Sequence, residues 1–283
     1  MKKSDPATKR RSAKGRIKPR RIVSSLRSRS FDLQSLRTAL KPFRLHFFPR
    51  IGSTNSHAMV LRKRGELYAP AVLLAARQIK GRGRGSNTWW SGEGSITATF
   101  VLPVEDHLQP HQVPLIAGLA VREAVAQLSG VQNIGLKWPN DLLHDGKKLA
   151  GLLCERVDRV DLIGVGVNVN VDLATIPKAL RQRVTSLRAM TGSEIPMNDV
   201  VAAIAQNLRK MMSRNDQPSF GPVLKEYDRH HVLVGKMVRV TAVPDEPSIV
   251  GKVTGLDGVG RLLVRDTRRT HAVIAGSVEI LDR

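Results

Sequence analysis

Two kinds of apolar run alternate from residue 44 onwards, and this alternation restricts the chain to a mixture of helices and strands. The segment SITATFVLP (95–103) alternates polar and apolar residues, which predicts a half-buried strand that ends at proline. LIAGLAVREAVAQL (115–128) repeats its apolar residues at helical spacing and predicts a core helix. Runs with the length of buried strands are RLHFF (44–48), AVLLAA (71–76) and DLIGVGVNVNV (161–171). We therefore expect an α+β fold with a mixed sheet.

Turn and capping residues place further elements. Asp145-Gly146 lies between two apolar runs and readily adopts the positive φ angles of a tight hairpin turn, so two strands should meet there. Ser53, Thr54 and Asn55 are good helix-capping residues and predict a helix that closes near Gly65. Other helices are expected at about 198–212, capped by Asn198, and at 220–230.

The character of the chain changes over its last fifty or so residues. Short apolar segments, GKMVRVTAV, SIVGKVTGL, RLLVRD and AVIAGSVEIL, are separated there by glycine and aspartate turns. This pattern predicts a small β-barrel-like domain. The boundary should lie near Val232 to Gly235, so that residues 44–232 form the main domain and residues 233–283 the small one.

Positive charge is concentrated at the N-terminus. The 283 residues carry a formal net charge of +22, and residues 1–30 contain twelve Lys or Arg against one acid, Asp5, so +11 of the +22 lies there. Because this segment has few apolar residues and no periodicity, we expect a disordered basic tail over residues 1–43. The composition suits a solvated tail, an organelle transit peptide or an arm that contacts nucleic-acid phosphates.

Composition excludes several classes of protein. No apolar run approaches the roughly 20 residues of a membrane helix, and no secretory signal is evident. We therefore expect no membrane partner and a cytoplasmic location, or an organellar one if the tail is a transit peptide. Cys154 is the single cysteine and is expected to be a small buried strand residue. The eight histidines show no metal-ligand spacing with it, so no fixed metal site is expected.

A glycine- and arginine-rich loop, residues 78–85, directly follows a predicted strand. Gly83 permits close approach to an anion, and Arg82 and Arg84 supply forked donors that match phosphate oxygens. Trp89, a few residues later, could stack on an adenine and exclude water. An exposed basic turn and an ordinary buried tryptophan are the alternative interpretations. The spacing fits neither a Walker loop nor a dinucleotide fingerprint.

Two charged segments, KWPND (137–141) and KLAG (148–151), flank the predicted hairpin turn. Lys148 and Asp141 are seven residues apart and can face one site across the hairpin. The ammonium group would offset phosphate or carboxylate charge there, and the carboxylate would orient it or hold Mg²⁺. This arrangement predicts phosphoryl or nucleotidyl transfer, whereas a surface ion pair is the commoner outcome for an isolated Lys/Asp pair.

Alternate glycines interrupt the apolar run 161–171. Gly164 and Gly166 leave one face of the predicted strand bare, so a flat ligand could lie against it with Asn168 at its polar end. Close packing of a helix would need the same glycines. Both interpretations are open at this point.

The order of these segments closely resembles that of the biotin protein ligase family. That family shows Ser-Thr-Asn, then Gly-Arg-Gly-Arg with a tryptophan eight residues after its first glycine, then Lys-Trp-Pro-Asn-Asp, Lys-Leu-Ala-Gly and Gly-x-Gly-x-Asn. All five occur here in this order, and the resemblance spans roughly residues 46–283. It implies a mixed-sheet biotin/lipoate ligase-like catalytic domain followed by a small SH3-like β-barrel.

The resemblance also implies roles for the matching positions. Biotin would be contacted by Ser53, Thr54, Asn55, Gln78, Arg82, Gly83, Arg84, Lys148, Gly164 and Gly166. ATP would be contacted by Arg82, Arg84, Trp89, Lys137, Asn140 and Asn168. Catalysis would rest on Lys148, Arg84 and Asp141, with Mg²⁺ arriving with ATP near Asp141.

The implied reaction is an ATP-dependent ligation in two steps. The enzyme would form biotinyl-5′-AMP and then transfer biotin to a lysine of the biotin carboxyl carrier domain of a biotin-dependent carboxylase. A homodimer is compatible with the family, and sequence-specific DNA binding is not expected because no helix-turn-helix pattern precedes the main domain. Some members carry a second arginine pair where this chain has Ser86 and Asn87, which leaves the tightness of adenylate retention open.

Two rival functions remain. A lipoate ligase or octanoyl transferase resembles biotin ligases in fold, although its motifs differ from GRGR and KWPND. A nucleic-acid-binding module that uses the basic tail is compatible with the Lys/Arg clusters, but a chain with 4% aromatic residues offers few stacking platforms.

Overall fold

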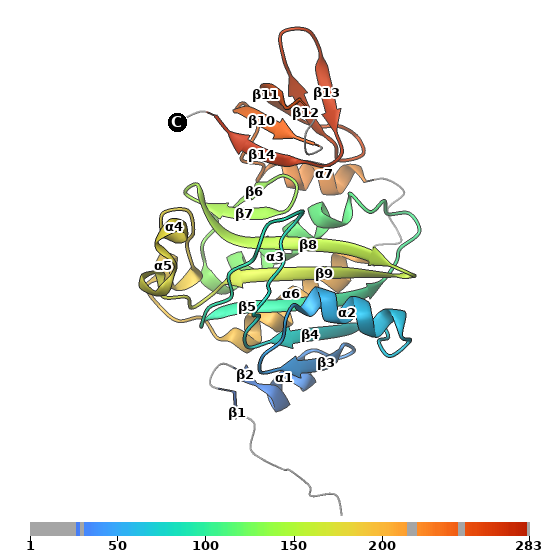
Figure 1. The fold of residues 1–283 in the computed structure, drawn as a ribbon, viewed down its shortest axis with the longest axis vertical. Helices are drawn as coiled ribbons and strands as arrows, with labels where there is room; N and C mark the ends of the chain where they lie inside the picture. The colour runs from blue at the N-terminus through green and yellow to red at the C-terminus, as the bar shows by residue number, and fades with distance from the viewer. Residues whose placement is uncertain (1–26, 29–30, 214–219, 243–246, 282–283) are drawn as a thin grey trace, which may run out of the picture.

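Two β-sheets organise the protein, whose computed structural model describes residues 27–28, 31–213, 220–242 and 247–281 (Figure 1). The strands of the larger sheet are β3 (Arg44–Phe48), β4 (Ala71–Ala75), β5 (Ser95–Pro103), β6 (Gly135–Lys137), β7 (Asp141–His144), β8 (Lys147–Val157) and β9 (Val160–Asn168). Their order is β3-β4-β5-β9-β8-β7-β6. Only β3 and β4 pair in parallel among these neighbours. The mixed sheet expected from the sequence is therefore confirmed.

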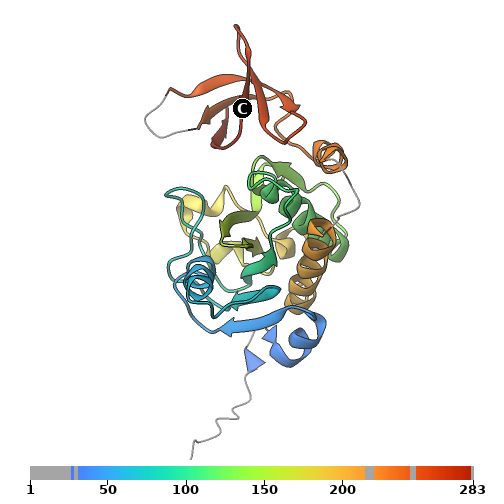
Figure 2. The ribbon, with the colours of Figure 1, turned by 90° about the vertical axis from the view of Figure 1, so that its right-hand side faces the viewer.

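Different structures cover the two faces of this sheet. Helices α3 (Val113–Ser129) and α6 (Met197–Met212) pack together on one side, which we call the helix face (Figures 1 and 2). Helix α2 (Thr54–Lys63) lies on the other side, which we call the pocket face. Because side chains of a strand alternate between faces, Ile163 and Val165 of β9 join the core under α3 and α6, whereas Gly164 between them lies on the pocket face.

Strand β5 is buried on both faces, which corrects the expectation of a half-buried strand. Ile96 and Phe100 belong to the core of the helix face. The polar residues Thr97 and Thr99 are nevertheless only 1% and 0% exposed. The alternating polarity therefore indicates a buried polar surface under α2, and not a surface in contact with solvent.

The segment around the Asp145-Gly146 turn forms three strands, one more than expected. Asp145 (φ 49°) and Gly146 (φ 73°) join β7 to β8, as predicted. Strand β6 was not anticipated, and it pairs with β7 so that Lys137 lies opposite Asp141. The motif KWPND is thus the end of one strand, a turn and the start of the next.

Residues 31–43 belong to the folded main domain, so the expectation of a tail extending to residue 43 is wrong for them. Strand β2 (Phe31–Asp32) pairs with β1 (Arg27–Ser28) and leads into α1 (Leu33–Ala39). The Asp32 carboxylate caps this helix by accepting hydrogen bonds from two backbone amides. Leu36 and Leu40 are buried at helical spacing in the core beside α6. The remaining expected tail, residues 1–26 and 29–30, lies outside the described residues.

The remaining helices are short apart from α6. Helix α6 begins at Met197 after Pro196, so the predicted cap at Asn198 is wrong; the Asn198 amide instead donates to Asp32 O at 2.8 Å. The other elements are η1 (Leu173–Thr175), α4 (Lys178–Arg181), α5 (Leu187–Thr191) and α7 (Gly221–Asp228). Within the described ranges, no helix combines the length and hydropathy needed to span a membrane.

The smaller sheet forms the C-terminal domain at one end of the molecule (Figure 2). Its strands are β10 (Met237–Thr241), β11 (Ile249–Leu256), β12 (Leu262–Arg265), β13 (Thr270–Val273) and β14 (Ser277–Ile280). All neighbouring pairs are antiparallel, in the order β13-β12-β11-β10-β14, which confirms a small C-terminal β domain. The buried indole of Trp138 donates from Nε1 to Gly260 O at 3.2 Å and ties the two domains together.

Candidate active site

A pocket of about 910 Å³ opens on the pocket face, between the sheet, the loop 77–92 and the small domain. Small-molecule sites commonly span about 300–1,000 Å³. All the residues to which the resemblance assigns a role line it: Ser53, Thr54, Asn55, Gln78, Arg82, Gly83, Arg84, Trp89, Lys137, Asn140, Asp141, Lys148, Gly164, Gly166 and Asn168. The fold therefore brings these positions together, while their individual roles remain predictions.

The floor of the pocket is the bare backbone of β8 and β9. Gly166 pairs with Gly151 across these strands, and Gly164 follows on the same face. A Cβ added at Gly164 would collide with Asn55, and one added at Gly166 would collide with the ring of Trp89. The first turn of α2 packs on Gly164, as the helix-packing interpretation expects, and the ring of Trp89 lies on Gly166. Binding of a flat ligand against this face remains a prediction.

A buried polar cluster occupies the start of α2. The Ser53 hydroxyl caps the helix, and Thr54 donates from its backbone N and its Oγ1 to Gln78 Oε1 at 2.7 and 3.1 Å. Thr99 Oγ1 lies 2.8 Å from Thr54 Oγ1 and 2.5 Å from Asn55 Oδ1. Ser53, Thr54, Asn55 and Thr99 are nearly inaccessible to solvent and Gln78 is half-buried, so their donors and acceptors keep fixed orientations.

The glycine- and arginine-rich loop forms a small hairpin beside the pocket. Gly83 N donates to Asn87 O at 2.8 Å, and Trp89 N donates to Gly81 O at 3.0 Å. Gly85 adopts a φ of 58°, which favours glycine at this turn. Asn87 also donates from its side chain to Arg84 O at 3.0 Å. Asn87 therefore stabilises the turn that carries Arg84.

Arg84 connects this loop to the small domain. Its Nη1 donates to Gly276 O at 3.1 Å and lies 3.5 Å from Asn140 Oδ1. Burial lowers the pKa of Arg84 from its ordinary value, and the Asp141 carboxylate partly offsets this effect. The guanidinium nevertheless remains charged at neutral pH. A partly desolvated cation thus lines the pocket.

Further charged groups meet Arg84 at the same end of the pocket. Lys148 Nζ lies 2.7 Å from Asp141 Oδ1, with both side chains largely shielded by the pocket walls. Burial lowers the pKa of Lys137, with Lys148 and Arg183 contributing in the same direction and Asp141 opposing them. The Lys148–Asp141 pair is therefore part of a cationic pocket and not an isolated surface ion pair. Such a cluster favours an anionic ligand.

Trp89 lies on the glycine floor. Its ring faces the bare position of Gly166, and Lys148 Nζ lies 5.8 Å from the ring centroid. The indole Nε1 is buried and has no hydrogen-bond partner among the described residues. A rigid aromatic surface with one free donor is thus held next to the cationic end of the pocket.

Two asparagines at the pocket wall are held by backbone carbonyl groups. Asn140 Nδ2 donates to Leu152 O at 2.6 Å, and Asn168 Nδ2 donates to Thr185 O at 3.0 Å. These bonds set the orientation of each side-chain amide and leave its oxygen as the group that can accept a further hydrogen bond.

Several contributions to the site were missed from the sequence. Thr99 lies in the polar cluster, and its alternation with apolar residues in a buried strand was the available signal. Glu155 ion-pairs with Arg82 on the pocket face of β8. Gly276 and Glu279 come from the small domain, and no local pattern links them to the site. In the described part of the chain, no group of three or more His, Cys, Asp or Glu is arranged to hold a metal.

Comparison with protein-family models and known sequences identifies the family. Residues 47–172 match the Biotin/lipoate A/B protein ligase family, and residues 233–281 match the Biotin protein ligase C terminal domain. The chain is 32% identical over 237 residues to the biotin–[acetyl-CoA-carboxylase] ligase of Mycobacterium tuberculosis, which covers 80% of this chain and 85% of that protein. The bifunctional ligase/repressor BirA of Bacillus subtilis is 30% identical over 216 residues, covering 74% of this chain and 66% of the relative. The chain belongs to the biotin protein ligase family.

Solved structures show the same relationship. The biotin protein ligase from Aquifex aeolicus in complex with biotin and ATP has a TM-score of 0.73 and 27% identity, covering 84% of this chain and 98% of that one. The Leishmania major biotin protein ligase in complex with biotinyl-5-AMP has a TM-score of 0.58 and 26% identity, covering 86% of this chain and 100% of that one. The family and the fold predicted from the ordered motifs are therefore confirmed.

Proposed function

We propose that this protein attaches biotin to a lysine of a biotin carboxyl carrier domain and uses ATP to form biotinyl-5′-AMP as the activated intermediate. The observation that carries the proposal is the convergence of Arg84, Asp141 and Lys148 at one end of a pocket whose floor is bare glycine backbone. A cationic end suits a carboxylate and a triphosphate, and the Trp89 ring held on the glycine floor suits a flat ring.

The polar cluster at α2 supports binding of the biotin ring. A ureido group offers two N–H donors and one carbonyl acceptor, so it needs partners of both kinds in fixed positions. The buried Thr54 and Asn55 and the half-buried Gln78 supply donors and acceptors from one hydrogen-bonded network. Discrimination is strong where a site is built to hydrogen-bond its ligand, because an analogue without those groups leaves buried polar atoms unpaired.

The nucleotide would occupy the neighbouring part of the pocket. Trp89 offers a ring for stacking, and its unpaired Nε1 offers a donor. Asn140 and Asn168 lie on the wall, and each side-chain oxygen can accept a hydrogen bond from an amino group, that of Asn140 in addition to its contact with Arg84. Lys137 adds a partly desolvated cation on the strand opposite Asp141.

Adenylation requires no protein nucleophile. An oxygen of the biotin carboxylate attacks the α-phosphorus of ATP, and the bond from that phosphorus to the bridging oxygen breaks as pyrophosphate leaves. Lys148, held by Asp141 at 2.7 Å, would bridge the carboxylate and the α-phosphate, and Arg84 would offset the charge that develops on the phosphoryl oxygens. The product is a mixed anhydride.

Mg²⁺ fits this site as a companion of ATP. Asp141 offers one carboxylate, already paired with Lys148, so phosphate oxygens and water would supply most ligands, as Mg²⁺ commonly prefers. When bound, the ion would neutralise charge on the phosphates and help pyrophosphate to leave.

Transfer completes the reaction. The amine of a lysine on the carrier domain attacks the carbonyl carbon of the anhydride, an amide forms, and AMP leaves with the electron pair of the broken carbon–oxygen bond. The loop 77–92 lies against the pocket and would shield the anhydride from water until the carrier arrives.

Lipoate ligation is the nearest alternative within the same fold. Lipoate and octanoate carry no ureido group, so they offer no donors or acceptors to match the polar cluster at Thr54 and Asn55. A ligand that binds only the native state raises its melting temperature. Biotin should therefore raise the melting temperature of this protein, and lipoate and octanoate should not.

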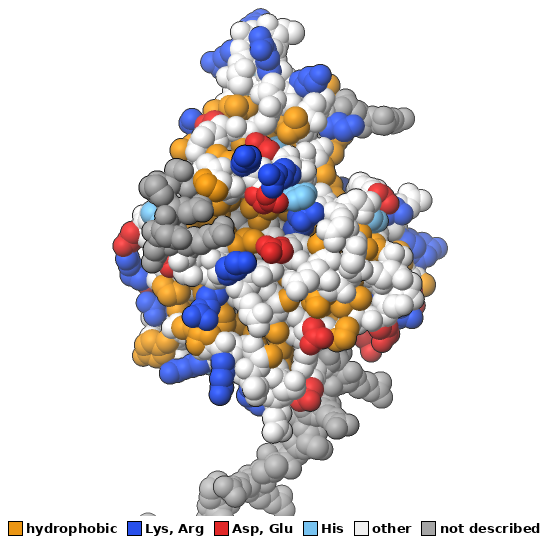
Figure 3. All heavy atoms as spheres, turned by 180° about the vertical axis from the view of Figure 1, so that it is seen from behind, with side chains coloured by type: hydrophobic (Ala, Val, Ile, Leu, Met, Phe, Trp, Pro, Cys, Tyr) orange, Lys and Arg blue, Asp and Glu red, His pale blue; other side chains and the backbone are white. Residues whose placement is uncertain are grey.

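Several expectations from the sequence remain predictions. They are the homodimer, the cytoplasmic or organellar location and the absence of sequence-specific DNA binding. The basic segment on which targeting or nucleic-acid contact would depend lies outside the described residues. On the face seen from behind, Lys and Arg side chains are scattered among acidic and apolar ones and do not form one continuous basic area (Figure 3).

The proposal is tested by biotin-dependent exchange of labelled pyrophosphate into ATP, with Lys148→Ala as the test variant and Lys147→Ala as the matched control. Lys147 is exposed next to Lys148 in the same strand. We expect exchange that requires biotin, survives Lys147→Ala and falls at least about 100-fold in Lys148→Ala. A folded wild-type protein that shows no exchange with Mg²⁺ present would refute the ligase function.

A further inference from the structure

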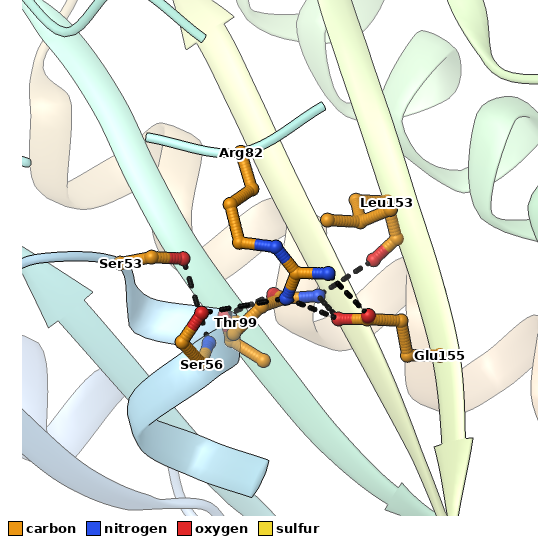
Figure 4. Close-up of polar contacts among 7 residues, drawn as sticks. Ser53, Ser56, Arg82, Thr99, Leu153 and Glu155 are labelled. Carbon is orange, nitrogen blue, oxygen red and sulfur yellow. Dashed lines mark hydrogen bonds and ion pairs between the residues drawn. The ribbon is translucent and has the colours of Figure 1, made fainter. Parts of the chain in front are cut away.

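Glu155 of β8 holds two parts of the pocket that are distant in sequence. Its Oε1 lies 2.8 Å from Arg82 Nη2, and its Oε2 accepts from Arg82 Nη1 at 3.2 Å (Figure 4). The same Oε2 accepts from Asn55 Nδ2 at 3.0 Å. One carboxylate therefore joins the glycine- and arginine-rich loop to the first turn of α2 across the sheet.

The position of Glu155 on the pocket face follows from strand pairing. Glu155 lies opposite Leu162 of β9, two residues from Leu153, which lies opposite Gly164. Side chains at every second position share a face, so the carboxylate lies on the same side as the bare glycines. It is 80% shielded from solvent, with a side-chain exposure of 20%. A bidentate pair in such a place is stronger than an open surface pair.

The contact with Asn55 fixes the orientation of its amide. Asn55 Nδ2 donates both to Glu155 and to Leu153 O, the latter at 2.9 Å. Its Oδ1 accepts from Thr99 at 2.5 Å and faces Gly164. Because Glu155 can only accept, it favours the amide orientation in which the oxygen of Asn55 is directed at the pocket floor.

The contact with Arg82 indicates that the two loop arginines have different roles. The Arg82 guanidinium is occupied by Glu155 and by Ser56 Oγ at 3.3 Å. Arg84 makes no ion pair with a carboxylate of the described residues and is the more buried of the two, at the cationic end of the pocket. Arg82 is thus placed to anchor the loop, and Arg84 to meet the ligand.

We propose that Glu155 is a positioning residue that fastens the loop through Arg82 and orients Asn55 toward biotin, so that it controls both biotin affinity and retention of the adenylate. This proposal rests on the ligase function proposed above. It gives Arg82 the role of an anchor in place of the direct contact with biotin and phosphate that the resemblance implies.

The first test needs no ligand. Trypsin can cut after Arg84 only when the loop leaves the pocket, and fragments that begin at Gly85 are identified by mass spectrometry. Glu155→Gln and Arg82→Gln should each increase this cleavage about 10-fold, since each removes one partner of the bidentate pair. The matched control is Asp106→Asn, which removes the exposed partner of Arg159 at 2.9 Å and should leave cleavage unchanged.

The second test distinguishes the two proposed roles of Glu155, which are fastening the loop through Arg82 and orienting Asn55. Glu155→Gln should raise the KM for biotin and the rate of adenylate release about 10-fold each, with kcat for pyrophosphate exchange within about twofold. The exchanged pair Arg82→Glu with Glu155→Arg should restore slow cleavage and slow adenylate release, because the ion pair is re-formed. Its KM for biotin should stay high, because an arginine at position 155 cannot accept from Asn55.

The outcomes are distinguishable. Wild-type cleavage and adenylate release in both Glu155→Gln and Arg82→Gln would overturn the proposal. If Glu155→Gln lowers the melting temperature sharply, its effects on cleavage and adenylate release could come from unfolding. In that case Arg82→Gln tests the proposal, because it breaks the same ion pair from its half-exposed side in the loop. A wild-type protein that forms no adenylate would refute the ligase function, while the cleavage assay would still test the anchoring of the loop.

Discussion

The two faces of β9 have different surroundings. On the helix face, Ile163 and Val165 are nearly inaccessible and pack under α3 and α6. On the pocket face, the intervening Gly164 and Gly166 leave the backbone bare, and Asn168 ends the row. The same strand thus supplies a close-packed core on one side and a binding floor on the other.

This difference shows that one strand can contribute to stability through one face and to function through the other. Residues on the helix face contribute mainly through buried apolar area, so changes there should alter the free energy of unfolding. Residues on the pocket face leave room for ligand and for side chains from the loop, so changes there should alter kcat/KM. The predictions below test this separation, starting with the largest expected effect.

Ile163→Ala tests the helix face. The side chain is fully buried, so we expect the free energy of unfolding to fall by about 3 kcal/mol, measured by urea denaturation. Biotin-dependent pyrophosphate exchange per folded molecule should stay within about twofold. Val250→Ala, at an exposed position in the small domain, is the control and should change stability by less than about 0.5 kcal/mol. A large loss of kcat/KM with unchanged stability would contradict the separation.

The pH dependence of stability tests a titratable group buried outside the pocket. Burial lowers the pKa of His231 from 6.5 to about 4. Neither ring nitrogen has a hydrogen-bond partner among the described residues, and the Asp228 carboxylate lies 3.8 Å from Nδ1. Between these two pKa values the unfolded chain binds a proton that the folded chain does not. Stability should therefore fall as the pH drops from 6.5 to 4, by about 3 kcal/mol from this group.

The variant His231→Leu isolates this contribution. Its unfolding free energy, measured from pH 7 to pH 4, should lose the part of the acid dependence that His231 causes. His107→Leu, at an exposed position, should keep the wild-type dependence. Parallel curves for wild type and His231→Leu would show that the buried histidine does not titrate as expected.

Gly166→Ala tests the pocket face. An added Cβ would collide with the ring of Trp89, which lies in a loop outside the sheet, so we expect the loop to be displaced and the fold to survive. The kcat/KM for biotin should fall roughly 100-fold, and the free energy of unfolding should change by less than about 1 kcal/mol. Steady-state kinetics and urea denaturation of the same preparation decide between this result and a purely structural role.

Gly118→Ala is the control for Gly166→Ala, because Gly118 is a glycine on the helix face. It should have the smallest effect. A Cβ at this position of α3 would meet only Leu136 Cδ2 at 3.4 Å, which is an ordinary contact. Alanine is the better helix former by up to about 1 kcal/mol, so the variant should be slightly more stable, with unchanged kcat/KM. A loss of activity here would show that the two faces are coupled.

Most of the fold could be predicted because its signals are local. The run of apolar residues at helical spacing before Gly130 became α3, and Asp145-Gly146 became the turn between β7 and β8. The helix α1 was missed because the excess of basic residues before it concealed the apolar spacing of Leu36 and Leu40. The net charge of a segment can be counted from its sequence, whereas the burial of individual residues depends on the parts of the fold against which they pack.

The candidate site was predictable to the extent that its motifs are contiguous. KWPND and the alternate glycines are contiguous motifs that can be recognised in the sequence, and the fold brings them to the lining of one pocket. Glu155 belongs to no such motif. It is an acid at the end of an apolar strand, and its role depends on contacts with Arg82 and Asn55, which come from other segments of the chain.

The sequence by itself determined the family, the mixed α+β architecture with its small β domain, and the groups available for chemistry, because these depend on periodicity, turn residues and ordered motifs. Only the tertiary structure decided which face of β5 and β9 is polar, that Gly276 of the small domain completes the site, and that Arg82 is paired while Arg84 lines the cationic end of the pocket. The physical reason is that burial, ion pairing and pKa shifts arise from neighbours in space, and strand pairing brings those neighbours together from positions far apart in the chain.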